Sequence, residues 1–91
     1  MMIEQYPDKL VRDDGSELSC RFYPNSRGVG IKKVIDGVEV YAKYVIALPL
    51  DTPTMLIGEV IIGYDRNGSV IVWKEELALF HPGQLHCVAY V

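Results

Sequence analysis

The sequence predicts a single all-β domain over residues 1–91, with at most one short helix. We expect a small antiparallel barrel or sandwich of SH3-like or OB-like size, with about six to seven strands. Two dipeptides, Asp36-Gly37 and Asn67-Gly68, lie between runs of β-branched and aromatic residues, which is the pattern of β-hairpins. A chain of 91 residues also leaves room for only one small core.

Turn-forming clusters delimit the expected strands. Residues 13–15, DDG, and 24–28, PNSRG, favour turns, and residues 48–58, LPLDTPTMLIG, contain two prolines and predict a long loop. Only residues 74–80, KEELALF, have a helix-forming composition, and they are enough for about two turns. Strands are expected near residues 9–12, 17–23, 29–35, 38–48, 59–66, 69–74 and 85–91.

The first hairpin is expected to have one dry and one wet face, because a two-residue turn at Asp36-Gly37 determines its register. One face is apolar apart from a single lysine, and the other face carries the charged residues. The pairs on the apolar face are Ile35 with Val38, Lys33 with Val40, Ile31 with Ala42 and Val29 with Tyr44. The pairs on the polar face are Val34 with Glu39, Lys32 with Tyr41 and Gly30 with Lys43.

The second hairpin, around Asn67-Gly68, is apolar on both faces. A two-residue turn there pairs Tyr64 with Ile71 and Ile62 with Trp73, and we take this face as the core face. The opposite face carries Ile61, Val70 and Val72, and Val45 and Ala47 add to the nominally polar side of the strand at 38–48.

Two explanations for the second apolar face remain open. It is covered by the N-terminal segment or by residues 74–80, or it contacts neighbouring subunits, as contiguous apolar patches on small soluble domains often do. The second explanation predicts an interface that includes the long loop. Its residues are Ile61, Val70, Val72, Val45, Leu50, Thr52 and Met55.

The stretch FHPGQLHC, residues 80–87, holds both histidines and one of the two cysteines. His86 and Cys87 are adjacent on an expected strand, so their side chains point to opposite faces and do not converge on one metal ion. No Cys-x-x-Cys or His-x-x-x-His spacing is present, and no base and orienting group accompany the thiol. We therefore interpret the stretch as a turn at Pro82-Gly83 that leads into a closing C-terminal strand.

No catalytic, cofactor-binding or metal-binding residues are predicted, and we expect neither an enzyme nor a small-molecule substrate. The formal net charge of −3 gives no footprint for nucleic acid. The N-terminus lacks the pattern of a signal peptide, and no apolar run approaches the roughly 20 residues that span a bilayer. We expect synthesis in the cytoplasm, no membrane partner and free thiols.

The run from Tyr44 to Val91 resembles small head-tail connector or minor capsid proteins of tailed bacteriophages and prophages. The resemblance is carried by YVIALPLDTP, then IGEVIIGYDRNG, then LALFHPGQLHCVAYV at the end of the chain. It implies a β-rich small barrel in the virion, a head-closure subunit of the neck with no catalysis. The implied partners are copies of itself in a ring and other neck proteins on the portal or tail side, with DNA only as passing cargo.

The alternative is a small-barrel binding module for single-stranded nucleic acid or for another protein. Small barrels of the OB and SH3-like type bind single strands through a basic stripe beside aromatic side chains. Four basic residues fall partly on one face of the expected first hairpin and could form such a stripe: Arg27, Lys32, Lys33 and Lys43.

Overall fold

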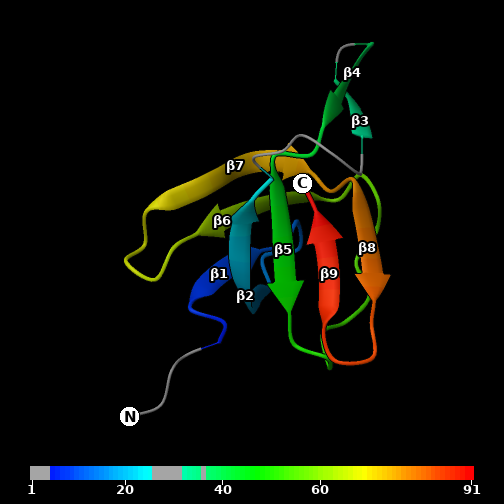
Figure 1. Cartoon of the computed structure of the whole chain (residues 1–91). Coiled ribbons are helices and arrows are strands. Elements are labelled where there is room, and N and C mark those ends of the chain that lie inside the picture. The colour runs from blue at the N-terminus through cyan, green and yellow to red at the C-terminus, as the bar shows by residue number, and fades with distance from the viewer. Residues whose placement is uncertain (1–4, 26–31, 36) are drawn as a thin grey trace.

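The computed structural model describes residues 5–25, 32–35 and 37–91, and within them the chain is all-β and contains no helix. Seven strands form one curled antiparallel sheet in the order β7-β6-β1-β2-β5-β9-β8, and β3 pairs only with β4 (Figure 1). The predicted fold class is confirmed as a small half-barrel. The strands are β1 (Asp8–Val11), β2 (Glu17–Pro24), β3 (Lys32–Ile35), β4 (Val38–Tyr41), β5 (Tyr44–Leu48), β6 (Val60–Tyr64), β7 (Val70–Glu76), β8 (Leu79–Pro82) and β9 (Cys87–Tyr90).

Strand β2 is the corner around which the sheet curls. Its first four residues pair with β1 and its last four pair with β5, so one continuous strand joins the two halves of the half-barrel. Alternate side chains, Cys20 and Phe22, point into the curl and are buried, while Arg21 and Tyr23 point outward. The core inside the curl consists of Leu10, Cys20, Phe22, Ile46, Leu48, Met55, Ile61, Val72, Leu77, Cys87, Ala89 and Val91.

The strand expected over residues 38–48 is broken at Ala42 and Lys43. Asn25 accounts for the break, because its backbone N donates to Lys43 O at 2.7 Å and its side-chain Nδ2 donates to Ala42 O at 2.8 Å. These carbonyls are therefore not available to a continuing ladder. The hairpin of β3 and β4 consequently projects away from the main sheet, as Figure 1 shows.

Within this hairpin the predicted pairing is confirmed where the structure describes it. The observed pairs are Lys32 with Tyr41, Lys33 with Val40, Val34 with Glu39 and Ile35 with Val38. The three predicted pairs that involve Val29, Gly30 and Ile31 lie outside the described residues.

The predicted register of the second hairpin is wrong. A two-residue turn of the expected type requires positive φ at both Asn67 and Gly68, but only Gly68 has it, at 85°. Gly68 N donates to Asp65 O at 3.0 Å and Asp65 N donates to Ser69 O at 2.8 Å, so the turn is longer and ends in a bulged glycine. The Asp65 carboxylate also accepts bonds from the backbone N of Asn67 and of Ser69.

The residues of β6 and β7 that lie in the core also differ from the expected ones. Tyr64 pairs with Val70, and further irregularities bring Ile61 opposite Glu75. Ile61 and Val72 are buried, whereas Trp73, expected in the core, has 58% of its surface exposed. The predicted core face of this hairpin is therefore corrected to the opposite face. Gly63 lies opposite Val72 and opposite the buried Leu10 of β1, so the side with Ile61 and Val72 faces the core.

The short helix expected over residues 74–80 is absent. The segment completes β7, bends at Leu77 and Ala78, and enters β8. Its backbone groups bind neighbouring segments, since Leu77 N donates to Glu59 O at 2.8 Å and Ala78 N donates to Tyr90 O at 2.7 Å. Two turns of helix are marginal alone, so these tertiary bonds and the burial of Leu77 decide the conformation.

The stretch FHPGQLHC forms the β8–β9 hairpin, as predicted for a join between two parts of the sheet. Pro82 pairs with Cys87, and Gly83 N donates to His86 O at 3.1 Å across the turn. Cys87 is buried and His86 is exposed, so the two side chains do lie on opposite faces. Both cysteines are free thiols.

Candidate interaction surface

Three residues of the predicted interface are buried within the chain itself. Ile61, Val72 and Met55 belong to the core, so they are corrected from interface to core residues. Ile61 and Val72 face the core because Gly63, on their side of the hairpin, lies opposite the buried Leu10 of β1. Met55 is buried because the long loop between β5 and β6 folds back over the open side of the curl.

The other four residues of the predicted interface are at least partly exposed, but they do not form one patch. Val70 lies on the edge strand β7, and Leu50 lies in the long loop. Thr52 is part of a turn in that loop, where its hydroxyl donates to Pro49 O at 2.6 Å. Val45 points outward from β5 and belongs to a larger surface that the sequence did not reveal.

This larger surface is the convex side of β2, β5, β9 and β8, which we call the outer face. Its first row consists of Tyr23, Val45, Tyr90 and Leu79, which are opposite one another across four strands. Its second row consists of Arg21, Ala47, Val88 and His81.

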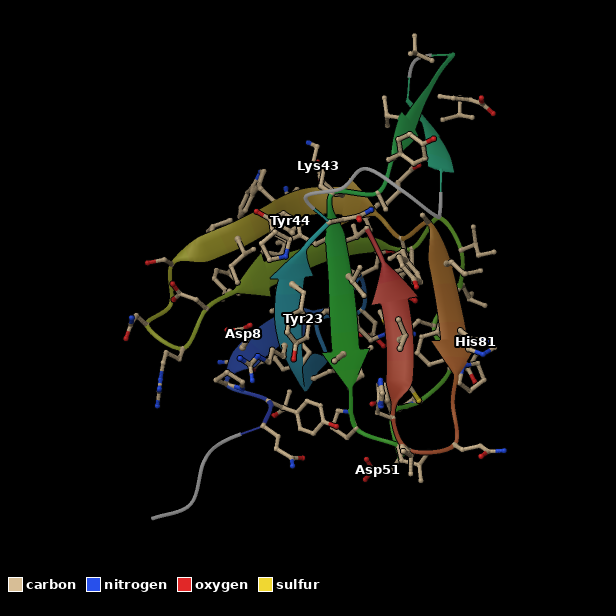
Figure 2. The ribbon with its side chains drawn as sticks, in the orientation of Figure 1. Asp8, Tyr23, Lys43, Tyr44, Asp51 and His81 are labelled. Atoms are coloured by element: carbon tan, nitrogen blue, oxygen red, sulfur yellow. The ribbon has the colours of Figure 1, made fainter. Side chains whose placement is uncertain are left out.

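The outer face is unusually apolar for the solvent side of an antiparallel sheet. Such a side normally carries polar residues, but six of these eight side chains are aliphatic or tyrosine. No element lies in front of β5, β9 and β8 in Figure 1, and Figure 2 shows Tyr23 in front of the sheet. The outer face is therefore a broad apolar surface with a cation, Arg21, at one end.

A hollow of about 300 Å³ opens at the Arg21 end of the outer face, and we call it the socket. The guanidinium of Arg21 lies 5.1 Å from the ring centre of Tyr23, a cation–π contact that orients both side chains. The socket is lined by Gln5, Tyr6, Arg21, Tyr23, Ala47 and His86.

The long loop presents a second apolar feature, Leu56 and Ile57, which we call the knob. These side chains are 69% and 70% exposed. They lie in a tight turn in which Glu59 N donates to Leu56 O at 3.1 Å and Gly58 adopts a φ of 87°. A glycine is favoured at this position, because side chains rarely tolerate that conformation.

A partly buried ion pair holds the knob in place. Arg12 Nε lies 2.7 Å from Glu59 Oε2, and its NH2 group lies 2.8 Å from Oε1, so the contact is bidentate. The two side chains are only 17% and 10% exposed. The hydrogen bonds from Arg12 lower the pKa of Glu59 and the same contact raises that of Arg12, so both stay charged.

The surroundings of the knob are acidic. A shallow groove of about 420 Å³ separates the knob from the β1–β2 turn, which carries Asp13 and Asp14. Asp14 accepts bonds from Ser16 N at 2.8 Å and Ser16 Oγ at 2.6 Å, and these bonds lower its pKa. Because Arg12 and Glu59 neutralise each other, the two aspartates leave this region with net negative charge.

The projecting β3–β4 hairpin is a third exposed apolar feature. Val34, Val38 and Tyr41 are all exposed on it. At its base the Lys43 ammonium lies 3.0 Å from the Glu75 carboxylate. Arg27, the first residue of the predicted basic stripe, lies outside the described residues.

Metal ligands and reactive thiols were sought among the described residues. No group of three or more His, Cys, Asp or Glu side chains among them is placed to hold a metal ion. Burial raises the pKa of the Cys20 thiol, which disfavours the thiolate that a nucleophile needs. In the same part of the chain, no helix is long and apolar enough to cross a membrane.

Sequence reasoning missed most of the surface. Tyr23 and Tyr90 were not predicted to lie at an interface, whereas Val45 and the long loop that carries Leu56 and Ile57 were. The local signal for the knob was the adjacent aliphatic pair before Gly58. No local signal existed for the outer face, because its rows join four strands that are distant in sequence.

Comparisons with protein-family models, with curated proteins and with solved structures find no match to this chain.

Proposed function

We propose that this chain is a non-enzymatic assembly subunit that acts through protein–protein contacts, with the outer face as its principal contact surface. The observation that carries the proposal is the row of Tyr23, Val45, Tyr90 and Leu79, which crosses four strands on the solvent side. A small soluble domain gains nothing in solution from such a row, and contiguous apolar patches of this kind mark contact sites.

The composition of the outer face supports a protein partner. Tyrosine and arginine are enriched in protein interfaces, because they combine apolar contact area with hydrogen-bonding groups. Tyr23 and Tyr90 supply two such anchors, and Arg21 supplies a guanidinium beside them. The hydrogen-bonded sheet around them provides a rigid base, so little conformational entropy is lost on binding.

In its finer form the proposal is a head-closure or connector subunit of a tailed-phage neck, in a ring with copies of itself and with other neck proteins. The resemblance of residues 44–91 to such proteins supports this form. That segment includes β5, β8 and β9, three of the four strands that build the outer face. DNA would pass such a ring as cargo and would not be read.

The test places a charge on the outer face and follows assembly. The chain is co-expressed with the proteins encoded beside its gene, and the mass of the purified particle is measured by light scattering. We expect Tyr23→Glu to fold, by circular dichroism, but to stay out of the particle, because an unpaired carboxylate would be buried.

Tyr41→Glu is the matched control, since Tyr41 on the projecting hairpin has the same exposed fraction as Tyr23, 44%. We expect this variant to assemble like the wild type. Normal assembly of Tyr23→Glu would refute the proposal, and loss of assembly in Tyr41→Glu alone would move the contact to the hairpin.

A further inference from the structure

We infer that the outer face binds the knob of a second copy of this chain, so that copies associate head-to-tail with Ile57 inserted in the socket. This inference rests on the proposed function and names the partner of the same surface. It requires that the two surfaces match in shape and charge, and that they cannot meet within one chain.

The shapes are complementary. The socket is a hollow at the end of an apolar sheet, bordered by the Tyr23 ring and floored by Ala47, a small side chain. The knob is a convex turn whose two aliphatic side chains are about 70% exposed, so both are available to fill a hollow. The socket residues Tyr23 and Arg21 are of the kinds that are enriched in interface hot spots, and burial of Ile57 against them removes apolar surface from water.

The charges are also complementary. Arg21 and His86 line the socket, and Asp13 and Asp14 flank the groove beside the knob. When Ile57 enters the socket, these aspartates approach a guanidinium, whereas a face-to-face contact between two outer faces would bring arginine toward arginine. Charge therefore favours the knob over a second outer face as the occupant of the socket.

The two surfaces lie on opposite sides of the same sheet. Met55, directly before the knob, is buried in the core on the concave side, whereas Arg21 and Tyr23 project from the convex side. A knob therefore reaches only the socket of another copy, and the contact is heterologous. A chain of such contacts still has one free knob at one end and one free socket at the other, so assembly continues or closes as a ring.

The conformation of the knob is fixed by contacts within its own chain. Besides the Arg12–Glu59 ion pair, the turn is fixed by Gly58 N donating to Leu77 O at 2.8 Å and by Leu77 N donating to Glu59 O at 2.8 Å. These bonds join the loop to the residues that directly follow β7 and β1. The loop is therefore ordered once the chain has folded, and little conformational entropy is lost when it binds.

Sedimentation velocity of the purified full chain over a concentration series tests the inference. We expect the weight-average mass of the wild type to rise with concentration, and Ile57→Glu and Tyr23→Glu each to remain monomeric. An equimolar mixture of these two variants should form a 1:1 complex, because Tyr23→Glu retains a knob and Ile57→Glu retains a socket.

A wild type that stays monomeric, or a mixture that forms no complex, overturns the inference. If Ile57→Glu self-associates like the wild type while Tyr23→Glu does not, another surface occupies the socket. In that case the inference fails and the proposed function stands. If neither the variants nor the particle assay distinguishes Tyr23→Glu from the wild type, the proposed function fails as well.

A charge reversal adds an independent test. Arg21→Glu should weaken self-association by about tenfold or more, and combining it with Asp13→Arg in the same chain should restore it. Gln5→Glu, which adds a negative charge at the outer rim of the socket without removing the cation, serves as the control and should weaken association less. Failure of Asp13→Arg to rescue Arg21→Glu contradicts the predicted pairing of the two charges.

Discussion

At the scale of single residues, two ion pairs differ in how much they stabilise the fold, because they differ in exposure to solvent. Arg12 and Glu59 come from segments 47 residues apart and form a bidentate contact with little access to water. The exposed pair of Lys9 and Glu17, at 2.7 Å, has similar geometry but more than half of each side chain in water. Water screens the attraction between Lys9 and Glu17 more strongly, so this pair stabilises the fold less than the pair of Arg12 and Glu59.

We predict that Glu59→Gln lowers the free energy of unfolding by about 1–3 kcal/mol at neutral pH, whereas Glu17→Gln changes it by about 0.5 kcal/mol or less. The folded-state pKa of Glu59 lies below its ordinary value of 4.5, so its contribution is present above that value. The contribution is lost as the pH falls through the folded-state pKa. Urea unfolding should therefore show a difference in unfolding free energy between the wild type and Glu59→Gln at neutral pH, and this difference should shrink below pH 4.5.

A second residue-scale prediction concerns Gly63, whose missing side chain leaves room for the ring of Phe22. A Cβ atom added at Gly63 would overlap that ring, with Cε2 only 2.9 Å away. Gly63→Ala should therefore cost about 1–3 kcal/mol of unfolding free energy. The double variant Phe22→Leu with Gly63→Ala should cost less than the sum of the single changes, and strict additivity of the two in thermal unfolding would contradict the contact.

At the scale of elements, the β6–β7 hairpin depends on the conformation of its turn. The sequence predicts a two-residue turn at Asn67-Gly68, but the Asp65 carboxylate binds two backbone N–H groups and favours a longer turn. Gly63 on β6 lies opposite both Val72 on β7 and the buried Leu10 on β1, so Val72 faces the core and Trp73 faces solvent. The Trp73 ring instead contacts the Lys74 ammonium, 5.2 Å from the ring centre.

We therefore predict that Trp73→Ala costs about 1 kcal/mol or less, whereas Val72→Ala, a smaller truncation, costs roughly 2 kcal/mol. The usual order of cost for tryptophan and valine is thus reversed. Chemical denaturation of the two variants tests this order. A larger loss of stability in Trp73→Ala than in Val72→Ala would contradict the observed core face and place Trp73 in the core.

At the scale of the whole molecule, the half-barrel is closed by a loop and not by a further strand. The sheet has free edges at β7 and β8, and Met55 from the long loop joins the core at the open side. Both thiols lie inside this closed core, on β2 and on β9. The rate at which a reagent labels these thiols therefore reports whether the long loop covers the core.

We predict that neither thiol reacts with an aromatic disulfide reagent in the native protein at a rate above that of global opening. Burial protects both groups, and it also raises the pKa of Cys20. Met55→Ala should increase the rate of labelling, because it removes the loop's anchor in the core. Leu50→Ala, a truncation of an exposed residue in the same loop, should leave the rate unchanged. Fast labelling of the wild type would contradict the closed core.

The sequence by itself determined the properties that depend on local chemistry. Turn dipeptides and β-branched runs predicted the all-β class, the pairing of Ile35 with Val38 and the role of FHPGQLHC as a join. Alternation along the last strand predicted that His86 and Cys87 point to opposite faces, and Cys87 is buried while His86 is exposed.

Tertiary structure alone decided which surfaces are covered and which are exposed. Ile61 and Val72 became core residues because β6 pairs with β1, which places Gly63, on the same face as both, opposite the buried Leu10. Residues 74–80 became strand because distant backbone groups bind them better than a two-turn helix binds itself. The outer face exists only because β2, β5, β9 and β8 align in register, and their order in the sheet is a long-range property that no local pattern encodes.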